Sequence, residues 1–264
     1  MKKLVYLSLF VFLALSLSSS VMVSLPSTLN KSFQPGENLR YLISYGFIDA
    51  GEATLEVNKS SKRGNNRELI HVKGIGRTLG GFNSFFKVYD VYESYIDKKG
   101  VFPWQFVRRV DEGGYLINQD YTFQHEKSKV KTAEGKEFKV PIGIQDMLSS
   151  FYYARTLNFS NIKVNDIFEF NCFMDEEIFP LKIKYVGEEV IHIRKGKFKC
   201  MKFVPVIQTG RLFQDESDVN FWVTSDDNHI PILVKAKIPV GSIKMHLVEW
   251  SGLKNPLSSK LEKR

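Results

Sequence analysis

The sequence predicts a mainly β protein: one curled antiparallel sheet, a barrel or a sandwich, with a single amphipathic helix packed on it or plugging it. Three observations predict this. Short runs of alternating apolar and polar residues recur along the chain, glycine- and asparagine-containing turns separate them, and one segment alone has helical periodicity. No strand-helix alternation that would build a parallel sheet, and no repeat of fixed period, is visible in the 264 residues.

The first 20 residues predict a secretory signal peptide. Lys2 and Lys3 precede an uncharged, mostly apolar segment over residues 4–17, and three serines follow at 18–20. No second apolar run is long enough to span a bilayer. We therefore expect a periplasmic or secreted protein, cleaved near residue 20.

The rest of the chain is expected to form one domain. Residues 21–34 are predicted to be a flexible lead-in, 35–256 a single β-rich domain and 257–264 a basic tail. The alternative is two β halves joined by the helical segment 143–160. The formal net charge of +8 is spread along the chain, and together with export this argues against a nucleic-acid partner.

The strand-like runs of the first half begin with residues 39–47, where alternation places one set of side chains on a common face. Gly51 is interpreted as a turn or bend, and 58–66 as a polar hairpin loop. The face of the first run carries Leu39, Tyr41, Ile43, Tyr45 and Phe47. Further runs follow at 53–57, 69–75, 85–97, 102–110, 115–124 and 127–132.

The second half has the same pattern of short alternating runs separated by turn residues. Strands are predicted at 167–174, 179–186, 190–194, 197–203, 219–224, 230–237 and 242–250. The turns between them are predicted at Gly187, Gly196, Gly210, residues 226–228 and Gly241.

The helix is predicted over residues 144–157. Stepped at 100° per residue, it has an apolar stripe and an opposite polar face. The stripe carries Ile144, Met147, Leu148, Phe151 and Ala154, and the polar face carries Asp146, Ser149, Ser150 and Tyr153.

Arg155 is the most informative residue, because it continues the apolar stripe of this helix. An unpaired buried guanidinium is unfavourable, so it needs a carboxylate, backbone carbonyls or a ligand anion. The alternative is a side chain that reaches solvent from the helix end. We expect Arg155 to be mostly buried and bonded to a carboxylate or to carbonyls of a strand on which the helix packs.

A second group of candidate residues lies on two neighbouring strand-like runs. Arg108 shares strand parity with Trp104, so an inward aromatic face would carry Arg108 inward too. On the run 85–97 both faces carry aromatic and charged residues, Tyr89 and Glu93 among them. The candidate ligand-binding residues are Arg108, Arg155, Trp104, Tyr89 and Glu93. A plain core containing a Glu93–Arg108 salt bridge is the competing interpretation.

The two cysteines, Cys172 and Cys200, leave two interpretations open. In an oxidising compartment they could form a disulfide. They could equally be two buried thiols on neighbouring strands.

Catalytic signatures are weak. The acidic clusters at 175–177, 215–218 and 226–227 each lie in a predicted turn, where such side chains cap backbone amides. The five histidines are scattered without zinc-ligand spacing, and no nucleophile elbow or phosphate-binding loop occurs. We expect no metal and no cofactor, and we favour a protein that is not an enzyme.

Three stretches, residues 33–57, 145–155 and 196–250, resemble the exported bacterial family called domain of unknown function 3108. The resemblance implies a secreted or periplasmic β-rich protein of the cell envelope. It supplies no catalytic residues.

The leading hypothesis is therefore an exported, non-enzymatic ligand-binding or envelope-maintenance protein. Its candidate ligands are an amphipathic lipid, a glycolipid or a glycan, with Arg155 and Arg108 meeting an anionic head group. Peripheral membrane association is a further expectation. The alternative is a carbohydrate-active envelope enzyme, a hydrolase or lyase that uses paired carboxylates. A structural partner in outer-membrane assembly is a third hypothesis, and the oligomeric state is left open.

Overall fold

The computed structural model describes residues 24–206, 218–238 and 241–262. Its strands form two antiparallel meanders within one continuous sheet. The first meander contains β1 (Asn38–Tyr45), β2 (Ile48–Gly64), β3 (Arg67–Thr78), β4 (Tyr89–Asp97), β5 (Pro103–Glu112), β6 (Tyr115–Gln124), β7 (Lys129–Thr132) and β8 (Glu137–Lys139). The second contains β9 (Ile167–Met174), β10 (Glu177–Ile193), β11 (Gly196–Pro205), β12 (Val219–Thr224), β13 (Pro231–Lys237) and β14 (Ser242–Ser251).

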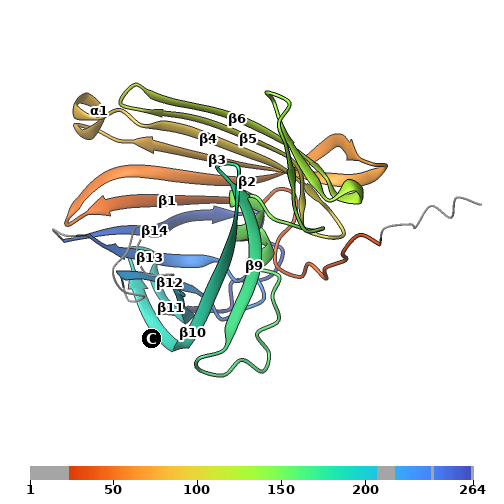
Figure 1. The fold of residues 1–264 in the computed structure, drawn as a ribbon. Coiled ribbons are helices and arrows are strands. Elements are labelled where there is room, and N and C mark those ends of the chain that lie inside the picture. The colour runs from red at the N-terminus through yellow and green to blue at the C-terminus, as the bar shows by residue number, and fades with distance from the viewer. Residues whose placement is uncertain (1–23, 207–217, 239–240, 263–264) are drawn as a thin grey trace, which may run out of the picture.

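The two meanders are joined by pairing between β1 and β14, which leaves β8 and β9 at the two ends of the strand order. Figure 1 shows the sheet curled so that the first meander lies above the second. The predicted fold class is confirmed in the form of one large, curled, unclosed antiparallel sheet.

Side chains connect the two ends of the curled sheet. The turn between β9 and β10 reaches the first meander, where Arg108 of β5 pairs with Asp175 at 2.9 Å. The ring of Phe173 on β9 packs edge-on against Tyr121 of β6, with centroids 5.1 Å apart. These side-chain contacts bring the two ends of the sheet together, although no backbone pairing closes it into a barrel.

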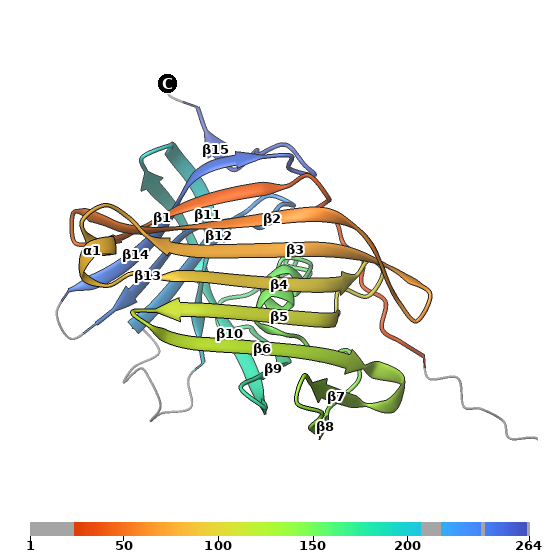
Figure 2. The ribbon, with the colours of Figure 1, turned by 90° about the horizontal axis from the view of Figure 1, so that it is seen from above.

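Helix α2 (Met147–Ala154) lies in this interior and is coloured green in Figure 2. Its N-cap is Asp146, whose Oδ1 accepts the backbone N–H groups of Leu148 and Ser149 at 2.8 and 2.6 Å. Ser149 Oγ accepts the N–H of Asp146 in return, which completes a capping box. The helix is shorter than predicted because this cap begins it at Met147.

The polar face of the helix does not face solvent. Asp146, Ser149 and Ser150 are all buried, because the helix has sheet on both sides. Their polar atoms are satisfied locally and by the sheet, where Ser94 Oγ of β4 donates to Asp146 Oδ2 at 2.6 Å. Leu148 and Tyr152 pack against the inner faces of β2, β3 and β4.

Several strand bounds differ from those predicted. β2 runs through Gly51 as far as Gly64, and its turn to β3 is made by Asn65 and Asn66, both at positive φ. β10 is one strand, because Gly187 at φ 141° forms a bulge in its pairing with β11. The short helices α1 (Phe82–Phe85) and η1 (His125–Lys127) were not predicted, and Gly210 lies outside the described residues.

The segments at both ends of the described chain contact the domain. Ser32 and Phe33, from the segment expected to be a flexible lead-in, are buried. At the other end β15 (Lys260–Leu261) pairs with β11, and the backbone N–H of Ser259 donates to Asp226 Oδ2 at 3.0 Å. No helix in the described part of the chain is long and apolar enough to cross a bilayer.

Cys172 and Cys200 are both buried and both free. They do not lie on neighbouring strands, because β10 separates β9 from β11. Along β10, Cys172 is paired with Phe179 and Cys200 with Glu189, ten residues further on. At about 3.3 Å per strand residue the two thiols are far too distant for a disulfide.

Candidate functional site

Arg155, directly after α2, is held inside the protein by three residues from two distant parts of the chain. Its Nη1 and Nη2 donate to the two carboxylate oxygens of Glu37 at 2.6 and 2.8 Å. Nε donates to the carbonyl of Asn228 at 3.0 Å, and Nη2 also to the carbonyl of Ser32 at 3.2 Å. The expectation that Arg155 is buried and bonded to a carboxylate is confirmed, whereas the two carbonyls belong to Ser32 and Asn228, which lie outside the strands.

The pair is isolated from water. The Arg155 and Glu37 side chains are 3% and 0% exposed. Burial alone would lower the pKa of Arg155, but the carboxylate of Glu37 outweighs it, and the pKa of the guanidinium is raised. Such a bidentate, charge-assisted pair is the geometry in which a buried guanidinium is best satisfied.

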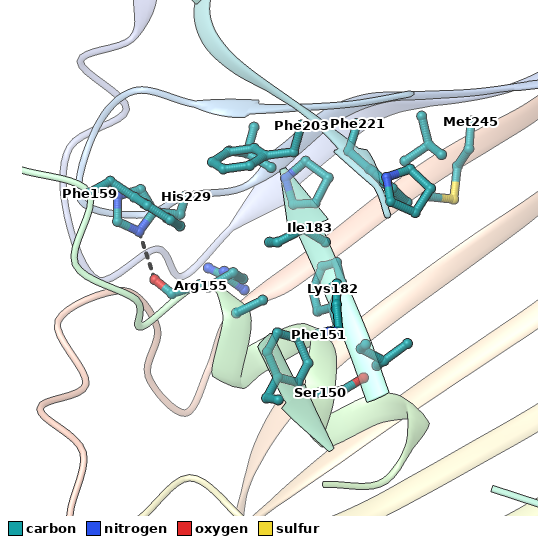
Figure 3. A pocket seen from close by; sticks show the side chains of 17 residues that line it. Ser150, Phe151, Arg155, Phe159, Lys182, Ile183, Phe203, Phe221, His229 and Met245 are labelled. Atoms are coloured by element: carbon teal, nitrogen blue, oxygen red, sulfur yellow. Dashed lines mark hydrogen bonds between the residues drawn. The ribbon is translucent and has the colours of Figure 1, made fainter. Parts of the chain in front are cut away.

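His229 lies beside this pair. Its Nδ1 is 2.7 Å from the carbonyl oxygen of Arg155, and the dashed line in Figure 3 marks this hydrogen bond. The Phe159 ring packs edge-on against the imidazole with centroids 4.9 Å apart. Burial lowers the pKa of His229, which favours the neutral ring. A neutral Nδ1–H then donates to the carbonyl.

A cavity of about 370 Å³ opens between α2 and the second meander. Figure 3 shows Phe151 and Arg155 on the helix side, with Phe203, Phe221 and Met245 across the space. The lining is almost wholly apolar and comes from α2, the segment after it, and strands β9 to β14. Its members are Ser150, Phe151, Ala154, Arg155, Phe159, Phe170, Leu181, Lys182, Ile183, Phe203, Pro205, Phe221, Val223, His229, Pro231, Val234 and Met245.

The polar groups of this lining are largely used elsewhere. The guanidinium of Arg155 donates four hydrogen bonds, to Glu37 and to the carbonyls of Ser32 and Asn228, and Ser150 Oγ donates to the carbonyl of Met147 at 2.8 Å. Lys182 pairs with Glu169 at 2.9 Å. The cavity therefore offers an incoming molecule hydrocarbon surface, with one partly exposed ion pair at its margin.

A second hollow of about 690 Å³ lies on the other side of Phe159 and His229. It is polar and bordered by the segments around Lys31, Asn158 and Asp227. Phe159 and His229 line both spaces, so these two side chains form the partition between an apolar cavity and a polar one.

The predicted site residues do not come together. Of the five, Arg155 alone lines the apolar cavity. Trp104 donates from Nε1 to Asp97 at 3.1 Å, deep in a separate cluster. Tyr89 is exposed at the start of β4, and Glu93 lies 2.7 Å from the imidazole of His71.

The expected Glu93–Arg108 salt bridge is wrong. Glu93 is paired in register with Val107, and Arg108 with Tyr92, so the two charged side chains leave opposite faces of the sheet. Arg108 does point inward, as predicted, but its partners are Asp175 and Gln119, at 2.9 and 3.2 Å.

The acidic clusters within the described residues act as turn and ion-pair groups. Asp175 and Glu176 have positive φ in the β9–β10 turn, and Glu176 pairs with Lys136 at 2.9 Å. Asp226 Oδ1 accepts from Thr224 Oγ1 and from the backbone N–H of Asn228. Residues 215 and 216 lie outside the described residues. Across the described ranges, no three His, Cys, Asp or Glu side chains gather as metal ligands.

Comparison with known proteins places the chain among uncharacterised families. The model of a family described as protein of unknown function DUF3108 matches residues 40–248. No curated protein matches the chain.

Among solved structures, a beta-barrel-like protein of domain of unknown function DUF1849 from Brucella abortus is similar at a TM-score of 0.55 and 12% identity, over 83% of this chain and 98% of that one. This likeness supports the fold alone. A DUF1089 family protein from Pseudomonas aeruginosa aligns at a TM-score of 0.37 and 9% identity, over 68% of this chain and 87% of that one.

Proposed function

We propose that this chain, which belongs to the family of proteins of unknown function DUF3108, is a non-enzymatic binding protein for an amphipathic lipid or glycolipid. The hydrocarbon part of the ligand would occupy the cavity between α2 and the second meander. In this proposal residues 1–20 direct the protein out of the cytoplasm, and it serves the cell envelope.

The observation that carries the proposal is the nearly unbroken apolar lining of a cavity of about 370 Å³. This volume lies in the range of roughly 300–1,000 Å³ typical of small-molecule sites. Burying an acyl chain there removes apolar surface from water on both partners, at about 25 cal/mol per Å². A sugar or a polar substrate would instead lose its hydrogen bonds to water without replacement.

The polar head of the ligand belongs at the margin of the cavity. The guanidinium groups of Arg155 and Arg108, the head-group candidates of the sequence, are already paired with Glu37 and Asp175. Lys182 is also paired, with Glu169, but these two side chains are 36% and 51% exposed, so their ion pair is open to solvent and to a competing head group. We therefore assign the head group to the neighbourhood of Lys182.

A cavity-filling variant tests this proposal. Val234 lines the cavity, and Val234→Trp places an indole in it. Val190 is exposed on β10 and outside the cavity, so Val190→Trp is the matched control. Displacement of a fluorescent fatty acid, and native mass spectrometry of protein purified under mild conditions, measure occupancy.

We expect the wild type and Val190→Trp to bind the probe, and Val234→Trp to weaken binding by about tenfold or more, since the lost burial exceeds 1.4 kcal/mol. Equal affinities in all three proteins, each with an unchanged melting temperature, would refute the cavity as the site.

A further inference from the structure

We propose that one end of the curled sheet, the aromatic rim, docks on the surface of an anionic lipid bilayer. The aromatic rim is defined by four connections: the β1–β2 turn, the β3–β4 link with α1, the β5–β6 turn, and the described residues on both sides of the β13–β14 turn. This inference does not require the cavity to hold a ligand.

These connections lie at the same end of the sheet because turns alternate between the two ends of an antiparallel meander. In register, Tyr45 is opposite both Ile48 and Ile243, and Tyr115 is opposite Glu112. Figures 1 and 2 show α1, the end of β1 and the start of β14 together at the left of the molecule.

The rim gathers the exposed aromatic side chains of the protein. Phe47 at the β1–β2 turn is fully exposed, at 103%, and Phe85 of α1 is 92% exposed. Within the part of the chain that the structure describes, every large aromatic residue that is exposed lies on this rim. The set is Tyr45, Phe47, Phe85, Phe86, Tyr89 and Tyr115, and the aliphatic Ile48, Leu116 and Ile243 accompany it.

Such a gathering is unlike the scattered single apolar residues of an ordinary surface. The β1–β2 turn carries two of these aromatics, the β3–β4 link three and the β5–β6 turn one. Aromatic rings presented in this way fit the interfacial region of a bilayer, which accepts amphipathic and aromatic side chains at the depth of the head groups.

The charge of the rim complements an anionic bilayer. Lys87, Lys237 and Lys244 are exposed on the same connections, and none has an ion-pair partner among the described residues. Glu112 is the exposed acid of these connections, whereas Asp49 is engaged by Arg194 at 2.6 Å. Each free lysine near an anionic surface adds to the attraction.

The rim is also continuous with the apolar cavity. Met245 lines the cavity, and Ile243, two residues earlier on β14, projects from the same face of the strand. Tyr45 is opposite Ile243 on β1. The apolar surface therefore extends from the cavity lining to the end that would contact lipid, which gives an acyl chain a route between bilayer and cavity.

Vesicle flotation tests the inference with the full chain. The probes are vesicles of phosphatidylglycerol and phosphatidylethanolamine, and vesicles of phosphatidylcholine alone. Phe47→Ser combined with Phe85→Ser removes the two most exposed rim aromatics, which support no core. Leu29→Ser combined with Val164→Ser is the control, because Leu29 and Val164 are exposed apolar residues outside the rim.

We expect the wild type and the control to float with anionic vesicles, and the rim variant to lose about tenfold or more of its partitioning at an unchanged melting temperature. Lys87→Glu with Lys244→Glu should weaken flotation and its salt dependence, whereas Lys59→Glu with Lys127→Glu, which changes two exposed lysines away from the rim, should not.

Three results would overturn the inference: a wild type that stays with neither vesicle, a control that falls as far as the rim variant, or a dimer in sedimentation that the rim variant abolishes. The last would assign the rim to a second copy of the chain. Val234→Trp separates this inference from the proposed function, because it should float like the wild type whether or not the cavity binds lipid.

Discussion

Replacing Arg155 by methionine should produce one of the largest losses of stability available in this protein. The substitution keeps most of the side-chain volume but leaves the carboxylate of Glu37, 0% exposed, without its cation. Removing one partner of a buried ion pair typically destabilises a protein by about 3–5 kcal/mol. For a domain of this size that corresponds to a fall in melting temperature of about 6–20 °C.

A double-mutant cycle locates the loss in the pair itself. Glu37→Leu combined with Arg155→Met removes both charges, so its loss should be smaller than the sum of the two single losses, by about 0.5–3 kcal/mol. Arg109→Met is the matched control, because Arg109 pairs with Asp120 at 2.6 Å on the surface, with both side chains more than 40% exposed. That loss should stay below about 1 kcal/mol.

Urea unfolding followed by tryptophan fluorescence measures the wild type and the four variants. The reasoning is refuted if Arg155→Met and Arg109→Met cost the same, or if the losses of the cycle simply add. The same variants decide between a structural and a ligand role for Arg155. A structural role lowers stability with or without the fatty-acid probe, whereas a ligand role would weaken probe binding and leave the melting temperature of the free protein unchanged.

Three further predictions concern buried groups. Burial raises the pKa of Asp146 from 3.8 to about 6, so between these pH values the folded state retains a proton that the unfolded chain releases. The free energy of unfolding should therefore fall as pH rises from 3.8 to about 6. Asp146→Asn should flatten this slope in urea unfolding at a series of pH values. Cys172 and Cys200 should resist iodoacetamide until the protein unfolds, because burial raises the pKa of both thiols. Formation of a disulfide between them under an oxidant would contradict the fold. Gly64→Ala should cost about 1–3 kcal/mol by urea unfolding, because its Cβ would overlap the Trp104 ring. A neutral result would mean that the ring moves freely.

Most of the sheet could be predicted from period-two alternation. β6, β9 and β12 have the predicted bounds. The predicted run 53–57 ends before β2 does, because the last residues of β2 are polar on both faces and project into solvent. The turn predicted at Gly187 is a bulge within β10, because a glycine at positive φ is accommodated in a bulge as well as in a turn.

The candidate site was predicted less well, for a physical reason. The helical wheel places Arg155 on the apolar stripe that packs inward, so its burial could be predicted from the neighbouring residues alone. Its partner Glu37 lies 118 residues away, and sequence separation carries no signal of that contact. Alternation predicted the strands that line the cavity, but the cavity itself depends on the curl of the sheet, which separates their inner faces from α2.

The pairing of β1 with β14 has a consequence for the order in which the chain assembles. Every other neighbour in the main strand order is next in sequence, so each meander can grow by closing short loops. Tyr45 pairs with Ile48 across a two-residue turn, but with Ile243 across nearly the whole chain. Closing that loop costs about 3–4 kcal/mol more in chain entropy than closing the hairpin. The β1–β14 ladder is thus the step at which two locally formed halves become one protein, and changes along it should act on the folding rate through chain closure.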